Sequence, residues 1–442
     1  MKLLTFSGGI HPKYNKGISI REPLREVPVP DTVVIPLSQH IGAPNEPVVK
    51  KGDYVEEGQV LGTSSAFISS PVHSSVSGTV KDIKKQAHPT LGASLSVIVE
   101  RDKEKSLKNY KETGIDDIDP GKFVENIKAM GIVGMGGAAF PTHVKLSIPE
   151  GKNVETLIIN GAECEPFLTC DHTIMTRKTI EILKGIEIVM DIIKPEKTFI
   201  AIENNKKAAY YAFQKLINES GRERIRGIKL VFLETKYPQG GEKQLIKAVT
   251  GREVPPGKLP LDVQCLVHNV GTVYAVFEAI YFSKPLMERI ITISGDCLDR
   301  PGNYKVKVGT TLKDIVDNAG IGLYKDPAKV IIGGPMMGFA QTGLEAPVLK
   351  STSGILFLTG DIAAAYEEDK CIRCAKCVDV CPVNLSPTDI MRNVSAQKWD
   401  ELESLWVSDC MECGSCAYSC PARIPLVQYI KQGKAALRSL SR

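Results

Sequence analysis

The sequence contains no long apolar run. A helix needs about 20 consecutive apolar residues to cross a bilayer. The stretch that comes nearest, residues 182–195, is interrupted by Lys184, Glu187, Asp191 and Lys194. The N-terminus also lacks the apolar block and cleavage site of a secretory signal. We therefore expect any contact with a membrane to be peripheral.

Neither sign of charge is in large excess. The net charge is +4 in a chain of 442 residues, of which 24% are charged, so the composition gives no reason to expect a nucleic-acid partner. A chain of this length is expected to form about three or four domains.

Cysteine is the residue that the sequence concentrates. Eight of its twelve cysteines fall within residues 371–421, in two copies of the spacing C-x2-C-x2-C-x3-C-P. Bacterial ferredoxins hold [4Fe–4S] clusters with this run, and the fourth cysteine of each run there binds the other cluster. We therefore expect two clusters, one held by Cys371, Cys374, Cys377 and Cys420, and the other by Cys410, Cys413, Cys416 and Cys381. Zinc sites do not need such a repeated run.

The surroundings of these cysteines predict a helical domain in a reducing compartment. Residues 383–409, between the two runs, carry apolar residues near helical spacing after a Ser386-Pro387 start, which indicates a helix. Clusters bound by thiolates favour a cytoplasmic location. The other four cysteines are expected to be buried thiols, and no histidine is assigned to a metal.

The N-terminal part predicts a small β domain. Residues 44–100 are strand-like, with turns at Gly52, Gly58, Gly62 and Gly78. Residues 47–62 resemble the hammerhead of biotinyl and lipoyl domains, but residues 63–70, where such a domain carries its modified lysine, contain no lysine. We expect an unmodified barrel with a structural or docking role.

A glycine-rich stretch at residues 131–145 is the next candidate site. Gly134, Gly136 and Gly137 allow the backbone to approach a ligand and to point N–H groups at a phosphate, and Lys145 could add a cation. A glycine cluster alone is more often a turn, and no acidic residue completes a dinucleotide fingerprint here. A strand at 154–159 follows, and helices at 173–193 and 206–219 alternate with strands at 197–202 and 228–233, which predicts an α/β fold.

Together these motifs resemble a known family. Gly134-x-Gly136-Gly137-Ala138-x-Phe140-Pro141-x-x-x-Lys145, Asn160-x-x-Glu163-x-Glu165-Pro166, the turn at 237–242 and Asn269 are similar to the flavin subunit of respiratory complex I. With the hammerhead and the two cysteine runs, the whole chain resembles the C subunits of Rnf electron transport complexes.

The resemblance implies non-covalent FMN and NAD(H) as substrate. Gly134, Gly136, Gly137 and Lys145 would hold the FMN phosphate. Asn160, Tyr237, Gly240, Glu242 and Asn269 would line the flavin, and Glu163 and Glu165 would lie near the nicotinamide as catalytic residues. The sequence departs from the complex I pattern at Met135, Gly241 and His268. These departures bear on the expected contacts with NADH and leave the expected FMN site in place.

The expected architecture is a multidomain α/β and α+β chain. It comprises an N-terminal region with the barrel (residues 1–115), an α/β domain for FMN and NADH (116–285), a β-grasp soluble-ligand-binding domain (286–360) and a ferredoxin-type domain (361–442). In the third domain we expect a hairpin of 289–296 and 301–306, a helix at 312–319 and a strand at 330–334. The glycine-rich turn at 333–338 is read first as structural, and second as a ligand contact.

The resemblance further implies a peripheral subunit on the cytoplasmic face of the cell membrane. Electrons would pass between NAD(H), FMN, the two clusters and partner subunits of an ion-translocating complex, which would reach ferredoxin indirectly. Two alternatives are a soluble cobalamin reductase with the same cofactors and a scaffold without cofactors. The tail at 424–442 is expected to be a helix that covers the cluster domain, or a basic amphipathic helix that binds a partner or an anionic membrane surface, with its short length favouring a protein over lipid.

Overall fold

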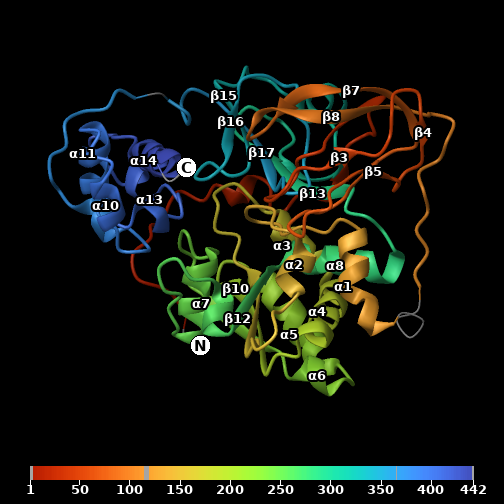
Figure 1. Ribbon diagram of the computed structural model, residues 1–442, viewed down its shortest axis with the longest axis horizontal. Coiled ribbons are helices and arrows are strands. Elements are labelled where there is room, and N and C mark those ends of the chain that lie inside the picture. Colours follow the sequence, from red (N-terminus) through yellow and green to blue (C-terminus); the bar gives the residue numbers. More distant parts are fainter. Residues whose placement is uncertain (1–2, 114–118, 365, 441–442) are drawn as a thin grey trace.

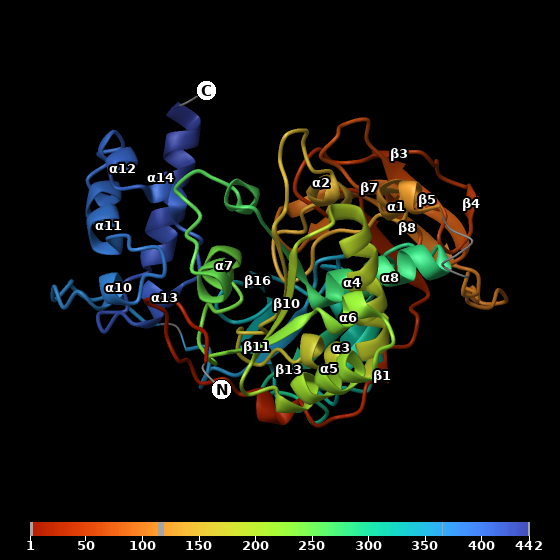
Figure 2. The ribbon, with the colours of Figure 1, turned by 90° about the horizontal axis from the view of Figure 1, so that it is seen from below.

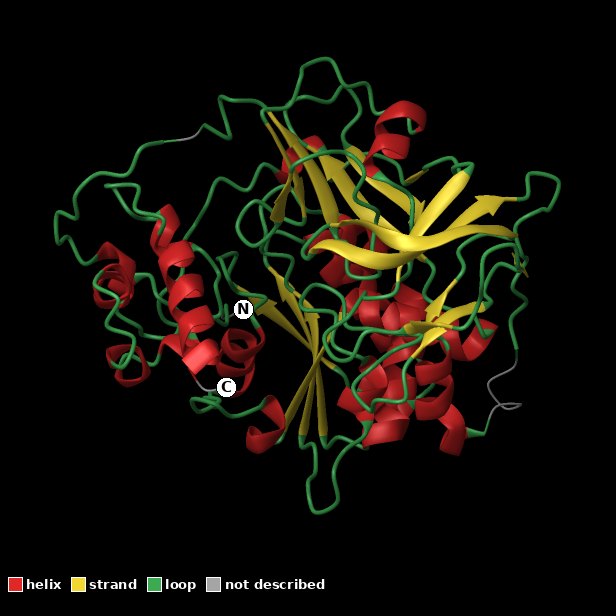
Figure 3. Cartoon of the chain, turned by 45° about the horizontal axis from the view of Figure 1, so that its top comes forward, coloured by secondary structure: helices red, strands yellow, loops and turns green. Residues whose placement is uncertain are grey.

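The computed structural model describes residues 3–113, 119–364 and 366–440 (Figure 1). Two sheet-containing units and a parallel α/β unit pack together, and a helical C-terminal unit lies to one side of them, as Figures 1 and 3 show. Among the described residues, no helix has both the length and the apolar character that a bilayer span requires.

Residues 32–101 form two small packed sheets. The first contains, in order, β2 (Thr32–Pro36), β8 (Gly92–Arg101), β7 (Gly78–His88) and β4 (Tyr54–Val55), and the second contains β3 (Glu46–Pro47), β5 (Val60–Thr63) and β6 (Val72–His73). Val33 and Ile35 of β2 are fully buried because alternate residues of a strand face the core. The lysine-free loop at 63–70 contacts the next unit, where the ring of Phe67 lies edge-on to that of His143.

The central unit has a parallel sheet with helices on both faces. The strands follow the order β11 (Lys229–Leu233), β10 (Lys197–Glu203), β9 (Thr156–Gly161) and β12 (Cys265–Asn269). Leu157 and Ile159 of β9 face the larger core, and Ile158 faces the smaller core beneath α7 (Glu242–Thr250). This strand is apolar almost throughout because both of its faces are buried.

The larger core of this unit is built from helices. They are α1 (Phe123–Ala129), α2 (Thr142–Leu146), α3 (Cys170–Arg177), α4 (Thr179–Ile193), α5 (Lys207–Glu219), α6 (Glu223–Arg226) and α8 (Val270–Phe282). The single helix predicted at 173–193 is wrong in one respect. The chain breaks at Lys178, whose φ of −128° lies outside the helical region, so α3 and α4 are separate helices.

The third unit is a mixed sheet with one short helix. The strand order is β1 (Arg25–Glu26), β14 (Gly302–Lys307), β13 (Glu288–Ser294), β17 (Gly354–Leu358), β15 (Lys329–Ile332) and β16 (Phe339–Gln341), with α9 (Leu312–Asn318). The predicted hairpin is present as the antiparallel pair β13 and β14. Thr311 begins α9 with a capping box, in which its side chain and that of Asp314 exchange hydrogen bonds with the backbone.

The described residues 366–440 form a C-terminal unit that contains helices and no strand (Figure 3). The helices are α10 (Lys376–Asp379), α11 (Pro387–Ser395), α12 (Glu401–Ser404), α13 (Ser415–Tyr418) and α14 (Leu426–Leu440). The predicted helix between the cysteine runs is divided, because Gln397 and Trp406 have positive φ angles of 54° and interrupt it. Pro387 occupies the first turn of α11, where proline is favoured.

The N-terminal segment before the small sheets joins all the other units. Leu4 bridges to Leu233 of β11, Ile10 bridges to Tyr237, and β1 pairs with β14. The Lys16 ammonium is buried and donates to the carbonyl oxygens of Glu165 (2.7 Å) and Leu168 (2.6 Å). The segment therefore acts as a strap that fixes the relative positions of the units.

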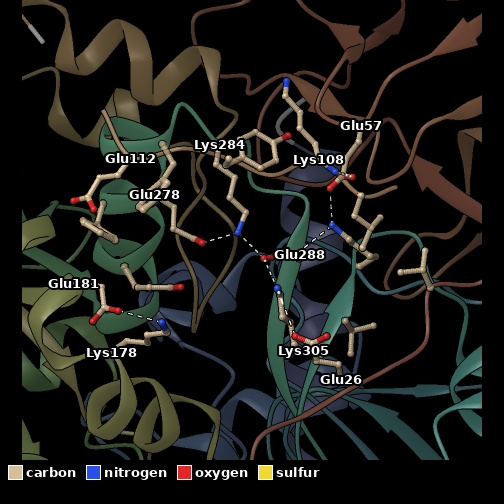
Figure 4. Close-up of a pocket in the computed structure, with 18 of the residues that line it drawn as sticks. Glu26, Glu57, Lys108, Glu112, Lys178, Glu181, Glu278, Lys284, Glu288 and Lys305 are labelled. Atoms are coloured by element: carbon tan, nitrogen blue, oxygen red, sulfur yellow. Dashed lines mark hydrogen bonds and ion pairs between the residues drawn. The ribbon is translucent and has the colours of Figure 1, made fainter. Parts of the chain in front are cut away.

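A cavity of about 560 Å³ lies where the first three units meet (Figure 4). Apart from Lys108, whose ammonium lies over the ring of Tyr110, its charged side chains pair with one another. Glu288 contacts Lys284 (2.5 Å), Lys305 (3.2 Å) and Lys307 (3.2 Å), and Lys307 also contacts Glu57 of the small sheets (2.8 Å). Since these charges are already paired, we read the cavity as an ionic clamp between units and not as the redox site.

Glu288→Gln should weaken this clamp. Burial opposes the charge of Glu288, but Lys284, Lys307 and Lys305 outweigh it and lower its pKa to about 2. Loss of one partner from a buried pair costs about 3–5 kcal/mol. Unfolding by denaturant, monitored by circular dichroism, should show that the free energy of unfolding falls by an amount of this order.

The same pKa shift determines how the contribution of Glu288 to the stability of the protein depends on pH. Because the pKa of Glu288 is depressed, its contribution is complete above pH 4.5 and is lost as the pH falls from there toward 2. The matched control is Glu26→Gln, since Glu26 is mostly exposed and lies 3.8 Å from Lys305. An equal effect of both substitutions would contradict the clamp.

Candidate functional site

The carboxyl edge of the parallel sheet brings two predicted site residues together. Asn160 is the penultimate residue of β9 and Asn269 the last residue of β12, and the two residues are direct neighbours in the sheet register. The Asn160 amide donates to the carbonyl oxygen of Gly240 (2.9 Å). The Asn269 side chain caps α8 by accepting from Gly271 N–H (2.7 Å). Polar groups at this edge of an α/β sheet are where such folds bind ligands.

The glycine loop lies beside Asn269. A Cβ on Gly136 would come within 3.0 Å of the Asn269 amide nitrogen, and the φ of Gly136 is +73°. Gly137 is exposed, and a Cβ there would meet nothing within 4 Å. Within the described chain, the N–H groups of Gly136, Gly137 and Ala138 have no hydrogen-bond acceptor. Three free N–H groups on an open backbone fit a phosphate.

Lys145 and Glu242 close the opposite side of this edge. The Lys145 ammonium, on α2, lies 2.5 Å from the Glu242 carboxylate at the start of α7. Burial, together with the nearby Lys145, lowers the pKa of His268 to about 3, so this histidine is neutral at pH 7. Gly136 therefore lies beside Asn269 and Gly240 beside Asn160, Glu242 follows Gly240 by two residues, and Gly134 closes the loop by donating its N–H to Phe140 O (2.8 Å).

Glu163 lies beneath this edge and is nearly fully buried. It accepts from the backbone N–H of Asp171 (2.8 Å) and lies 3.5 Å from the ammonium of Lys206, which is also paired with Glu203. Burial opposes its charge, but Lys206 and Lys16 outweigh burial and hold the pKa of Glu163 below its usual value. In this geometry Glu163 is an ionised anchor under the site.

Glu165 links two units. Its carboxylate accepts from the backbone N–H groups of Met336 (3.1 Å) and Met337 (2.9 Å), in the glycine-rich turn of the third unit. Burial raises the pKa of Glu165 to about 7. These contacts give the turn at 333–338 a structural role.

The Tyr237 hydroxyl contacts the second cysteine run. Its hydroxyl donates to the carbonyl oxygen of Cys413 (2.7 Å), and the residue is buried. Tyr237, Cys164, Ile10 and Cys413 form one apolar cluster with Met336, Val380 and Met411 packed against it. The turn at 237–242 therefore belongs both to the candidate flavin site and to the contact with the cluster unit.

Four of the predicted ligands line one small cavity. They belong to the first predicted set: Cys371, Cys374, Cys377 and Cys420. Cys374 is exposed and Cys371 is partly exposed, and the Cys371 sulfur accepts from Arg373 N–H (3.4 Å). Convergent thiols from both runs fit a four-iron cluster, and N–H···S contacts favour the thiolate that a cluster requires.

The other four predicted ligands are grouped more deeply. Cys381, Cys413 and Cys416 are buried, and Cys381 lies close enough to Cys410, Cys413 and Cys416 to influence the pKa of each. Burial raises the pKa of Cys410 to about 11, so binding of a cluster must release protons. Backbone N–H groups again contact sulfur, from Leu385 to Cys381 (3.2 Å) and from Glu412 to Cys410 (3.3 Å).

The C-terminal helix covers this unit. Leu426 and Ile430 of α14 are buried in the same core as the cysteines, and Gly433 lies against Leu402 and Val394. The Lys434 ammonium donates to Cys410 O (2.5 Å). These contacts favour the cover over the partner-binding helix, although the exposed end of α14 leaves the second interpretation as a hypothesis.

The sequence did not single out several residues that hold this site. Asp171 accepts from the Asn269 amide (2.8 Å), and burial raises its pKa to about 6. Gln244 of α7 donates to Pro382 O (3.2 Å), at the end of the first cysteine run. No local motif marks these partners, because the fold brings them together from distant positions.

A glycine loop with free N–H groups beside a parallel sheet, joined to a unit with two four-cysteine sets, is an arrangement that fits an iron–sulfur flavoprotein. Four family models agree with this class. They match the Nuo51 FMN-binding domain over residues 127–278, the RnfC barrel sandwich hybrid domain over 4–104, the SLBB domain over 290–340 and the 4Fe-4S dicluster domain over 363–422. The protein therefore binds FMN and two [4Fe–4S] clusters, as predicted.

Whole-length relatives identify the family. The chain is 43% identical over 99% of its length to the C subunit of the proton-translocating ferredoxin:NAD(+) oxidoreductase complex of Clostridium ljungdahlii, and covers 95% of that protein. It is 44% identical over 90% of its length to the Na(+)-translocating counterpart of Acetobacterium woodii, and covers 89% of it. The chain belongs to the family of C subunits of these complexes, which confirms the predicted resemblance.

Other relatives are longer. The C subunit of the ion-translocating oxidoreductase complex of Edwardsiella ictaluri is 40% identical over 99% of this chain, but the chain spans only 54% of that protein. The solved structure of an NAD+-reducing [NiFe]-hydrogenase can be superposed on 75% of this chain, with 17% sequence identity and a TM-score of 0.49. The matched part is 69% of the hydrogenase chain.

Cys381→Ala should remove the cluster of the second run. Cys381 is grouped with Cys410, Cys413 and Cys416, so EPR of the reduced protein should lose that signal and keep the other. The reciprocal variant is Cys420→Ala, which should affect the cluster of Cys371, Cys374 and Cys377. Loss of the first-run signal in Cys381→Ala would show that each run holds its own cluster.

Gly137→Trp should abolish FMN binding without unfolding the protein. The substitution has room in the chain itself but fills the space over the free N–H groups. FMN released on denaturation should fall at least tenfold per protein. The control is Gly221→Trp, another exposed glycine with nothing within 4 Å. Full FMN content in Gly137→Trp would exclude the loop as the phosphate site.

Proposed function

We propose that the protein is the peripheral NAD(H)-linked subunit of a membrane-bound, ion-translocating ferredoxin:NAD oxidoreductase, on the cytoplasmic face of the membrane. The observation that carries the proposal is the relation over nearly the full length to the C subunits of two such complexes. Ferredoxin would be reached indirectly, through partner subunits.

The site residues receive the following roles. Gly134, Gly136, Gly137 and Lys145 hold the FMN phosphate, and Asn160, Tyr237, Gly240, Glu242 and Asn269 shape the flavin side of the site. When bound, a flavin connects the two-electron chemistry of a nicotinamide with the one-electron chemistry of a cluster. Support comes from the free N–H groups of the loop and from the Lys145–Glu242 pair that faces it.

Glu163 and Glu165 are proposed to act on the nicotinamide side of the same site. Glu163 acts through its position, since its carboxylate is held by Asp171 N–H and Lys206. The partly exposed Glu165 carries a pKa of about 7, so it can hold or release a proton near neutral pH.

The two cysteine sets are proposed to hold clusters at different distances from the flavin. The second set (Cys381, Cys410, Cys413 and Cys416) is proposed as the inner cluster, next to the flavin. Support comes from the Tyr237–Cys413 hydrogen bond and from Met411, whose methyl group would lie 2.7 Å from a Cβ on Gly241. The first set is proposed as the outer cluster, since Cys374 is exposed.

Two alternatives are less well supported. A soluble cobalamin reductase would share the cofactors, but the order of units here, from barrel to flavin unit to closing cysteine runs, matches the C subunits over nearly their full length. A scaffold without cofactors has no use for the open glycine backbone and the two cysteine sets.

The proposed order can be tested by removing one cluster at a time. In Cys374→Ser, NADH should still reduce the inner cluster. In Cys413→Ser, NADH should no longer reduce the outer cluster, although dithionite does. Anaerobic EPR after NADH addition measures both, with FMN content as the control for folding. The opposite pattern would reverse the order.

A further inference from the structure

We propose that the loop around the outer cluster is a docking surface for a protein partner that presents carboxylates around its own redox centre. The surface, here called the outlet face, is formed by the exposed residues Tyr366, Lys370, Ile372, Arg373 and Lys376, of which Ile372 also lines the cavity of the outer cysteine set. The inference rests on the proposed function, because it assigns the chemistry of the partner that the outer cluster meets.

Exposure of the outlet face is the first observation. Ile372 is 68% exposed and Tyr366 60%. Large apolar side chains this open, next to a thiol ligand that is itself exposed, are typical of a surface that another protein covers. The inner set shows the opposite arrangement, since three of its four cysteines are buried.

Charge is the second observation. Every charged residue from Lys370 to Lys376 is a cation, and Arg423 adds another by stacking over Tyr366 at 3.8 Å. Within the described chain, none of the four has a carboxylate within ion-pair distance. Cations that are free of ion pairs and flank the exposed ligand Cys374 in the chain can pair locally with carboxylates that surround a partner's redox centre.

A protein fits this face better than an anionic lipid surface. The cations are followed by Asp379 and preceded by the acidic residues 367–369, all exposed. A flat anionic bilayer would repel these carboxylates, whereas a protein can match cations and anions separately. Electron transfer also requires that the partner's centre come close to Cys374, which a lipid headgroup does not offer.

The test is a charge reversal with a matched control. The outlet variant combines Lys370→Glu and Lys376→Glu. The control combines Lys50→Glu and Lys51→Glu, exposed lysines outside the cluster unit that change the net charge equally. Both variants should keep FMN, iron content and the EPR signals of both clusters.

Binding and electron transfer are then measured with membranes that carry the remaining subunits. The outlet variant should bind at least tenfold more weakly and lose NADH-linked electron transfer through the complex, and binding of the unaltered protein should weaken as salt rises. The control variant should behave as the unaltered protein. Carbodiimide cross-linking should join Lys370 or Lys376 to Asp or Glu of a partner subunit.

Three results would overturn the proposal. These are equal binding by both variants, cross-links only between two copies of this chain, and binding of the outlet face to vesicles of anionic phospholipid without any partner subunit. If the unaltered protein neither binds these membranes nor supports NADH-linked transfer, the proposed function itself fails. If it does both and the outlet variant does too, only the docking surface is wrong.

Discussion

The hydrogen bond from the Tyr237 hydroxyl to Cys413 O is the contact on which the arrangement of the two redox units depends. It joins the turn that shapes the candidate flavin site to the loop that supplies most ligands of the inner cluster. Gln244, which donates to Pro382 O, adds a contact to the first cysteine run, and Lys243 lies 4.0 Å from Asp409. In Figure 2, α7 is the element of the α/β unit that lies nearest the helical unit. In the proposed order of cofactors, electrons would cross this same interface between the units.

Burial divides the charged groups of the protein into two kinds. Lys206, Glu163 and Glu203 are sealed under the sheet edge, where their pairing keeps buried charges tolerable and fixes the loop that carries Glu165. Lys145 and Glu242 form a partly exposed pair, and both are proposed to contact the cofactor. At the far end of the molecule, Lys370, Arg373 and Lys376 remain without a described ion-pair partner at the surface. The buried ion pairs thus lie beneath the candidate site. The exposed charged side chains lie where a ligand or partner is proposed to bind.

Features that depend on a short stretch of sequence could be predicted. Contacts between residues far apart in the chain could not. The cysteine spacing, the glycine loop and the strand ends at Asn160 and Asn269 follow from short patterns, and the structure brings them together. The break at Lys178 and the interruptions at Gln397 and Trp406 were missed, because one residue in a non-helical conformation leaves the apolar periodicity almost unchanged. Lys16 and Asp171 were missed because their partners lie far away in the chain. Tyr237 was expected to line the flavin site, and its contact with Cys413 shows a second task that no motif could indicate.

The central claim is that the cluster held by Cys381, Cys410, Cys413 and Cys416 lies nearest the flavin and that the other lies at the surface. The most direct test is diffraction at the iron absorption edge from anaerobic crystals that contain FMN. The account predicts two iron peaks, of which the one nearer to the flavin is surrounded by these four cysteines. A nearer peak bound by Cys371, Cys374 and Cys377, or two peaks each bound by a single run, would contradict it.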